Sequence, residues 1–129
     1  MSTKGEMNQD RMYTTLNPMI EAIFCKATEC QMKGDFADAL LLYKEIVGKE
    51  PNNVRAFQSI ADVLDHMGNH DEALVWYDRA LEYDPNNAET WYNKGMTLRK
   101  TGCQEEGLSC IRKGISLAMN APSPRFRVE

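Results

Sequence analysis

"EPNNVRAF" occupies residues Glu50–Phe57 and "DPNNAETW" occupies residues Asp84–Trp91. Each stretch places Pro-Asn-Asn shortly before an aromatic residue, and the two prolines are Pro51 and Pro85. A motif that recurs at this distance within a short chain is typical of repeat proteins, in which one supersecondary unit is used several times. The same spacing as that between Pro51 and Pro85 relates other residues along the rest of the chain.

Three successive stretches, residues 20–53, 54–87 and 88–121, place matching residues at the same positions. A bulky apolar residue is fourth in each stretch, and a small residue follows four positions later. The bulky residues are Ile23, Phe57 and Trp91, and the small ones are Ala27, Ala61 and Gly95. Residues four apart share one face of a helix, so the first half of each stretch is predicted to be an amphipathic helix.

The second half of each stretch carries the start and stop signals of another helix. Gly34, Gly68 and Gly102 are predicted to end the first helices, because a helix C-terminus favours a residue that tolerates positive φ. Asp35 and Asn69 are predicted to cap the second helices, with Glu72 completing a capping box. Pro51 and Pro85 end these second helices, and the asparagines after them cap the next first helix, as Asn17-Pro18 does for the first stretch.

The pattern resembles the tetratricopeptide repeat family. The second stretch, "VRAFQSIADVLDHMGNHDEALVWYDRALEYDPNN", is the most similar, and the first is looser but keeps Gly34, Ala39, Tyr43 and Pro51. The resemblance implies an all-α fold, a right-handed α-solenoid of three antiparallel helix pairs, with a concave groove lined by the first helices. We expect an N-terminal segment (1–16) acting as a partial cap, a three-repeat domain (17–121) and a C-terminal tail (122–129).

The family register also predicts which residues line the groove. They are Glu21, Phe24, Thr28, Arg55, Gln58, Asp62, Asp65, Glu89, Tyr92, Asn93, Met96 and Arg99. Phe24, Tyr92 and Met96 are either apolar anchors for a ligand or ordinary half-buried packing residues. The mixture of acidic residues with Arg99 and Lys100 favours an amphipathic ligand that carries basic residues. The carboxylate clamp by which some family members grip chaperone tails is absent, because Phe24, Thr28, Ser59, Glu89 and Asn93 stand at its positions.

The last repeat departs from the other two. Gly107 and Gly114 replace larger residues inside its second helix, and each glycine costs on the order of 1 kcal/mol relative to alanine. We therefore expect the helix over residues 105–119 to be the least stable element. Leu108, Ile111 and Ile115 repeat apolar positions that pack on a following repeat elsewhere, so self-association into a homodimer through this face is the alternative function.

Composition and motifs exclude several other functions. The net charge of −4 opposes general binding to nucleic acid or to anionic membranes, and no apolar run is long enough to span a membrane, which predicts a cytoplasmic location. The four cysteines lack metal or redox spacing, and His66 and His70 are separated by a predicted turn. No nucleophile, zinc or phosphate-binding signature is present, so we expect no enzyme activity, metal or cofactor. The sequence predicts a non-catalytic scaffold that binds a protein or peptide partner in its groove.

Overall fold

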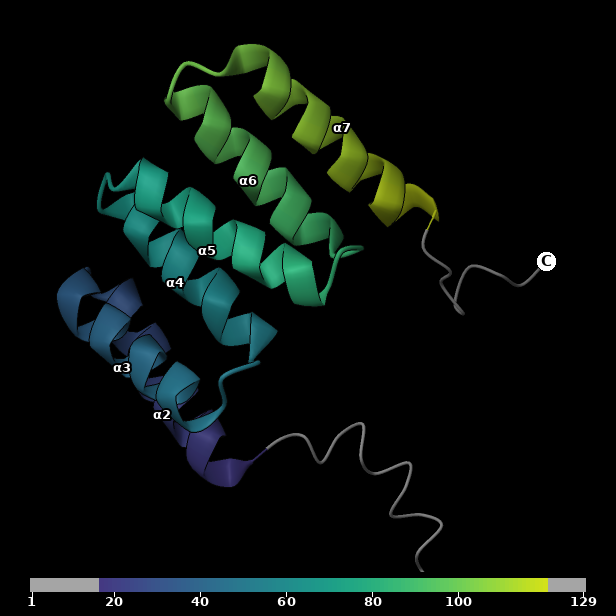
Figure 1. Ribbon diagram of the computed structural model, residues 1–129. Helices are drawn as coiled ribbons and strands as arrows, with labels where there is room; N and C mark the ends of the chain where they lie inside the picture. Colours follow the sequence, from purple (N-terminus) through teal and green to yellow (C-terminus); the bar gives the residue numbers. More distant parts are fainter. Residues whose placement is uncertain (1–16, 121–129) are drawn as a thin grey trace, which may run out of the picture.

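The computed structural model describes residues 17–120, which form six α-helices in three antiparallel pairs. The pairs are α2 (Pro18–Met32) with α3 (Phe36–Lys49), α4 (Val54–His66) with α5 (His70–Tyr83), and α6 (Ala88–Lys100) with α7 (Gln104–Asn120). The pairs are stacked in a row, from α2 and α3 at one end to α6 and α7 at the other (Figure 1). This arrangement is the α-solenoid that the repeated pattern predicted. The predicted N-terminal cap and C-terminal tail lie outside the described residues.

The first helix of each pair starts and ends near the glycine and asparagine residues that the sequence predicted. Gly34, Gly68 and Gly102 have φ angles of 84°, 87° and 94°, which glycine adopts without the steric cost of a side chain. The side chains of Asn53 and Asn87 cap α4 and α6, because each accepts a hydrogen bond from a backbone amide three residues later, at 2.9 and 3.0 Å. The first helices therefore begin and end where the sequence indicated.

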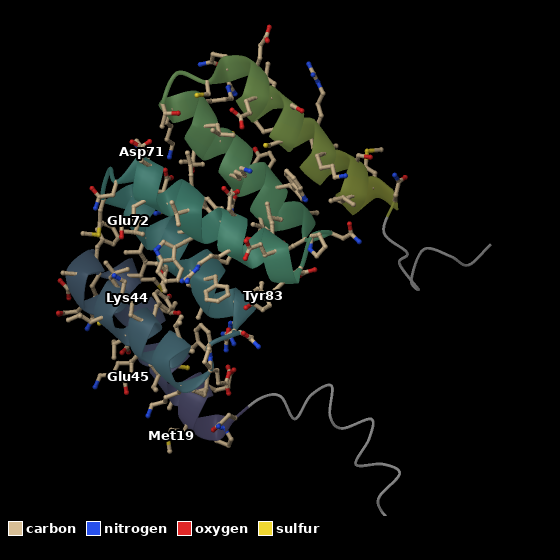
Figure 2. The ribbon with its side chains drawn as sticks, in the orientation of Figure 1. Met19, Lys44, Glu45, Asp71, Glu72 and Tyr83 are labelled. Atoms are coloured by element: carbon tan, nitrogen blue, oxygen red, sulfur yellow. The ribbon has the colours of Figure 1, made fainter. Side chains whose placement is uncertain are left out.

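The predicted caps of the second helices are wrong in one respect. Asp35 and Asn69 precede α3 and α5, but neither side chain makes a capping hydrogen bond. Both residues also close the preceding helix, where their amides donate to the carbonyls of Cys30 and Leu64 at 2.8 Å. This closing turn holds Asp35 at φ −84° and ψ 68° and Asn69 at φ −89° and ψ 67°, away from the extended conformation of the caps that do bond. Glu72 lies beside Asp71 in the first turn of α5 (Figure 2), where its charge favours the helix N-terminus without a capping box.

The main hydrophobic core lies between α2, α3, α4 and α5. Its members are apolar or aromatic and almost fully buried, and they include Ala27, Ala39, Tyr43, Ile46, Ile60, Ala61, Leu64, Ala73 and Tyr77. Each helix packs on the next one along the chain, and α4 also contacts α6. At the far end of α5, Tyr83 (Figure 2) packs on Phe57 with ring centroids 5.8 Å apart. Because these contacts join helices of the same or adjacent pairs, the core runs along the row of helices.

The helices α6 and α7 approach each other more closely than a Cβ atom at their glycine positions would allow. A Cβ atom on Gly95 would lie 2.5 Å from the carbonyl oxygen of Gly107, and one on Gly114 would lie 2.7 Å from the carbonyl oxygen of Ala88. Separations below 3.0 Å are essentially never seen for real Cβ atoms. The close approach of the two backbones therefore requires the glycines of α7. From the sequence alone, these glycines were expected only to lower the stability of the helix. That α7 is the least stable helix stays a prediction.

The open face of α7 carries the apolar residues that were predicted for self-association, with one exception. Leu108 and Ile115 are 38% and 47% exposed, and Met119, which the sequence did not single out, is 77% exposed. Ile111 is half-buried, and its side chain packs against Gly95 of α6. Its position in the repeat corresponds to Tyr43 and Tyr77, which also turn toward the first helix of their own pair. At the opposite end of the row, Met19 is exposed on α2 (Figure 2).

Candidate functional site on the first helices

The predicted groove residues lie on α2, α4 and α6, and the structure gives them three degrees of exposure. Thr28, Arg55, Glu89, Tyr92 and Arg99 are exposed. Glu21, Gln58, Asp62, Asp65, Asn93 and Met96 are half-buried, and Phe24 is buried. Eleven of the twelve side chains therefore have surface that a ligand can reach.

Phe24 belongs to the core rather than to the exposed part of the groove. Its side chain is only 3% exposed, and its ring packs on Tyr43 with centroids 6.0 Å apart. The guanidinium group of Arg55 covers the ring, with the central carbon 3.8 Å from the ring centroid. This is a cation–π arrangement that shields the aromatic face from solvent. The sequence assigned Phe24 to the groove from the family register, which does not show how Tyr43 and Arg55 pack around its ring.

Arg55 also joins the first two repeats through an ion pair. One nitrogen of its guanidinium, Nη1, donates to both carboxylate oxygens of Glu21, at 2.9 and 3.1 Å. Both side chains remain partly exposed, so the pair adds little stability and mainly fixes the position of Arg55. Beside it, a hollow of about 590 Å³ lies between the start of α2 and the turn that leads into α4.

Asp65 is the centre of a hydrogen-bond network that joins α4, α5 and α6. It accepts hydrogen bonds from Lys100 Nζ at 2.6 Å, His70 Nδ1 at 2.8 Å and Thr97 Oγ1 at 3.1 Å. Burial alone would raise the pKa of Asp65, but these three donors stabilise the carboxylate and hold its pKa below the usual range. Asp65 is therefore a charged carboxylate whose donors all come from this chain.

Asp62, one turn before Asp65, has a different environment. Its Oδ1 accepts a short hydrogen bond from the Tyr77 hydroxyl. Burial raises the pKa of Asp62, the Tyr77 hydrogen bond offsets part of that rise, and the negative charge of Glu89 on α6 adds to it. Burial and the charge of Asp62 also raise the pKa of Tyr77, which stays a protonated donor. In the first repeat Thr28 takes the position of Asp62, and its Oγ1 lies 3.3 Å from the Tyr43 hydroxyl. That hydroxyl donates to Gln31 Oε1 at 2.8 Å.

An apolar hollow opens where α6 and α7 come close together. Its volume is about 320 Å³, and it is lined by Ala88, Glu89, Tyr92, Gly114, Ile115 and Ala118. Tyr92 is 44% exposed here, so this predicted groove residue presents much of its side chain to solvent. The sequence did not predict the hollow. The one residue that could have indicated it is Gly114, which allows α7 to lie close to α6.

The two histidines serve separate local contacts. His66 donates from Nδ1 to the carbonyl oxygen of Asp62 at 2.8 Å and stacks on Phe36, whereas His70 donates to Asp65. Residues 17–120 contain no group of three or more His, Cys, Asp or Glu side chains that could hold a metal ion. All four cysteines are free thiols, and burial raises the pKa of Cys110. Within the same range, no helix has the length and apolar character needed to cross a membrane.

Comparisons with known proteins agree with this geometry. Sequence models described as "Tetratricopeptide repeat" match residues 32–96 and 88–119. Human tetratricopeptide repeat protein 7A is 24% identical over 106 residues, which cover 82% of this chain but only 12% of that protein. The chain therefore spans a small part of that relative.

Solved structures of other proteins share the fold, and two of them illustrate the likeness. The secretion chaperone SycD of Yersinia enterocolitica, in complex with a peptide of the translocator YopD, has a TM-score of 0.76 at 18% identity, covering 84% of this chain and 82% of SycD. The tetratricopeptide repeat domain of Sgt2 from Aspergillus fumigatus has a TM-score of 0.76 at 19% identity, covering 83% of this chain and 71% of that one. With the matching sequence models and the three stacked helix pairs, these likenesses lead to one conclusion: the chain belongs to the tetratricopeptide repeat family.

Proposed function

We propose that this chain is a non-catalytic module that binds a peptide or helix of a partner protein on the surface formed by α2, α4 and α6. The observation that carries the proposal is the exposed Tyr92 at the edge of an apolar hollow. An aromatic side chain beside an apolar hollow is the kind of anchor point that dominates binding energy in protein interfaces. SycD, which has the same fold, was solved with a peptide, and this supports the proposal by analogy.

The test is a peptide selection followed by a comparison of two variants. Peptides are selected from a displayed random library on the immobilised chain, and the Kd of each enriched peptide is measured against Tyr92→Ala and Leu41→Ala. Leu41 is the control, because it is also an exposed apolar residue but lies on α3, a second helix of its pair. We expect Tyr92→Ala to weaken binding about tenfold or more and Leu41→Ala to leave it unchanged. Equal Kd values for the two variants, or no enriched peptide, would overturn the proposal.

Self-association is the second candidate, favoured by the exposed Leu108, Ile115 and Met119 on α7. A head-to-tail stack of copies would repeat the internal junctions of the solenoid. At the junction of the second and third repeats, Asp78 and Lys94 form an ion pair at 2.7 Å. The equivalent positions at the two open ends are Arg112 and Lys26, so stacking would oppose two cations. The apolar face of α7 is therefore better suited to a two-fold dimer than to a filament.

Light scattering over a range of protein concentrations tests this candidate. Leu108→Glu is compared with Leu41→Glu, which adds the same charge to an exposed leucine on a helix at the other end of the row. Self-association through α7 predicts a mass that rises with concentration in the wild type and in Leu41→Glu, but not in Leu108→Glu. A monomer at every concentration in all three proteins would exclude it.

A further inference from the structure

Three basic side chains that lie among the groove residues, Arg55, Arg99 and Lys100, are already engaged by other residues of the chain. Arg55 is held by Glu21, and Lys100 is held by Asp65. Arg99 donates from Nε to the side-chain oxygen of Gln104 on α7 at 3.1 Å. A ligand with acidic groups would have to compete with these contacts, so the positive charges of this surface are poorly placed for capturing a carboxylate.

Two acidic side chains of the same surface have no such counterpart. Within residues 17–120, neither Asp62 nor Glu89 forms an ion pair with a basic side chain. Asp62 receives only the Tyr77 hydroxyl at Oδ1, and the described residues supply no hydrogen bond to Oδ2. The two carboxylates also repel each other, since the charge of Glu89 disfavours the ionised form of Asp62. A cation placed beside them would relieve this repulsion.

One member of the acidic pair, Glu89, also lines the apolar hollow between α6 and α7. Glu89 takes part in both, because it acts on Asp62 across the groove and also lines the hollow with Tyr92 and Ile115. Lysine and arginine have apolar stems and a charged end, so such a side chain can lie along Tyr92 while its charge remains at the carboxylates. The surface therefore offers negative charge and apolar contact side by side.

Building on the proposed groove function, we propose that the partner is an amphipathic segment with a lysine or arginine next to a bulky apolar side chain. The basic group is held by Asp62 and Glu89, and the apolar side chain enters the hollow at Tyr92, Gly114 and Ile115. Charge complementarity sets the choice of partner and the apolar contact supplies affinity. The preference is opposite in sign to that of a carboxylate clamp.

Three designed helical peptides test the proposal directly. They share an apolar stripe of leucine and alanine and differ only in their polar positions, which are lysine, glutamine or glutamate. Binding of each labelled peptide is measured by fluorescence anisotropy at about 50 mM and about 300 mM NaCl, where screening differs strongly. We expect the lysine peptide to bind about tenfold or more tightly than the glutamine peptide at low salt, and the glutamate peptide to bind most weakly.

A charge-matched pair of double variants separates the site from the overall charge. Asp62→Asn with Glu89→Gln and the control Glu45→Gln with Glu82→Gln both change the net charge from −4 to −2. The first pair should bring the lysine peptide to the affinity of the glutamine peptide, and the control should leave it near the wild-type value. Asn at position 62 keeps an acceptor for Tyr77. If circular dichroism shows that this double variant is unfolded, Glu89→Gln alone, at an exposed position, serves as the test and should still weaken binding severalfold.

The remaining outcomes distinguish the two proposals. Equal losses in the two double variants would show a bulk charge effect and overturn the preference for a basic ligand. Tighter, Tyr92-dependent binding of the glutamine or glutamate peptide would overturn the same preference while leaving the groove function intact. If every peptide that binds does so equally well to Tyr92→Ala, the groove function itself fails, and the preference with it.

Discussion

Gly114→Ala is expected to destabilise this protein, although alanine is the better helix former. The new Cβ atom would lie 2.7 Å from the carbonyl oxygen of Ala88 and 2.9 Å from the amide nitrogen of Tyr92. Both are backbone atoms of α6, so α7 as a whole has to move away. Overpacking of this kind costs about 1–3 kcal/mol, and the gain in helix propensity returns about 1 kcal/mol. Because the atoms in the way belong to the backbone and cannot turn aside, the cost should lie in the upper part of that range, about 2–3 kcal/mol. The expected net loss in the free energy of unfolding is then about 1–2 kcal/mol.

Gly48→Ala is the matched control, because Gly48 lies inside α3 and a Cβ atom there would meet nothing within 4 Å. The propensity term acts alone at that position, so a gain of up to about 1 kcal/mol is expected. Urea denaturation followed by far-UV circular dichroism measures both variants, with tryptophan fluorescence as a second probe. In a chain of this size, 1 kcal/mol corresponds to roughly 4 °C in Tm.

The opposite signs of the two variants are the essential result. If Gly114→Ala were as stable as the wild type, or gained stability as Gly48→Ala does, the close approach of α6 and α7 would not limit the residue at position 114. The glycines would then be a simple cost to the last helix, as the sequence alone suggested. Agreement between the two optical probes would show that the whole row of helices unfolds as one unit.

Three further predictions use other parts of the structure. Thr90→Val should raise stability by about 1 kcal/mol, because the buried Thr90 hydroxyl finds no hydrogen-bond partner among residues 17–120. Thr97→Val should lower stability by removing a donor to Asp65. Urea denaturation of both variants measures the two signs, and a loss of stability in each would contradict the first prediction. The pKa of Asp65 is lowered in the folded state, so its contribution is present at neutral pH and is lost as the pH falls below about 4 and through the folded pKa. Asp65→Asn should accordingly destabilise the chain at pH 7 and much less near pH 3, and an equal loss at both would refute the charge argument. Hydrogen exchange should be fastest among the helices in α7, which within residues 17–120 packs mainly on α6. Slower exchange there than in α4 or α5 would show that the close contact with α6 outweighs the open face.

The fold was predictable because the residues that start and end its helices have few structural alternatives. Glycine tolerates the positive φ at residues 34, 68 and 102, and asparagine caps the helices that start after Asn53 and Asn87. These requirements recur at the same positions of successive repeats, so each repeat confirms the others. The fold class and the helix pairs follow from that agreement.

Details that depend on close distances were less predictable. The family register placed Phe24 in the groove, but the structure buries its ring beneath Arg55. Gly114 looked like a defect in a helix, because the sequence does not show how near α6 comes. The pairing of Lys100 with Asp65 likewise depends on the separation of two helices. Such contacts follow from the packing of helices, which the repeat pattern alone does not specify.

The ion pairs that cross the junctions give the three repeats a fixed order. In a chain shortened by removing residues 54–87, Lys44 would take the position of Asp78 and face Lys94, and Gln31 would replace the carboxylate that holds Lys100. The first and third repeats would then meet with like charges in contact. These units are therefore not interchangeable modules, and a change in copy number would have to rewrite the charges on both sides of the new junction.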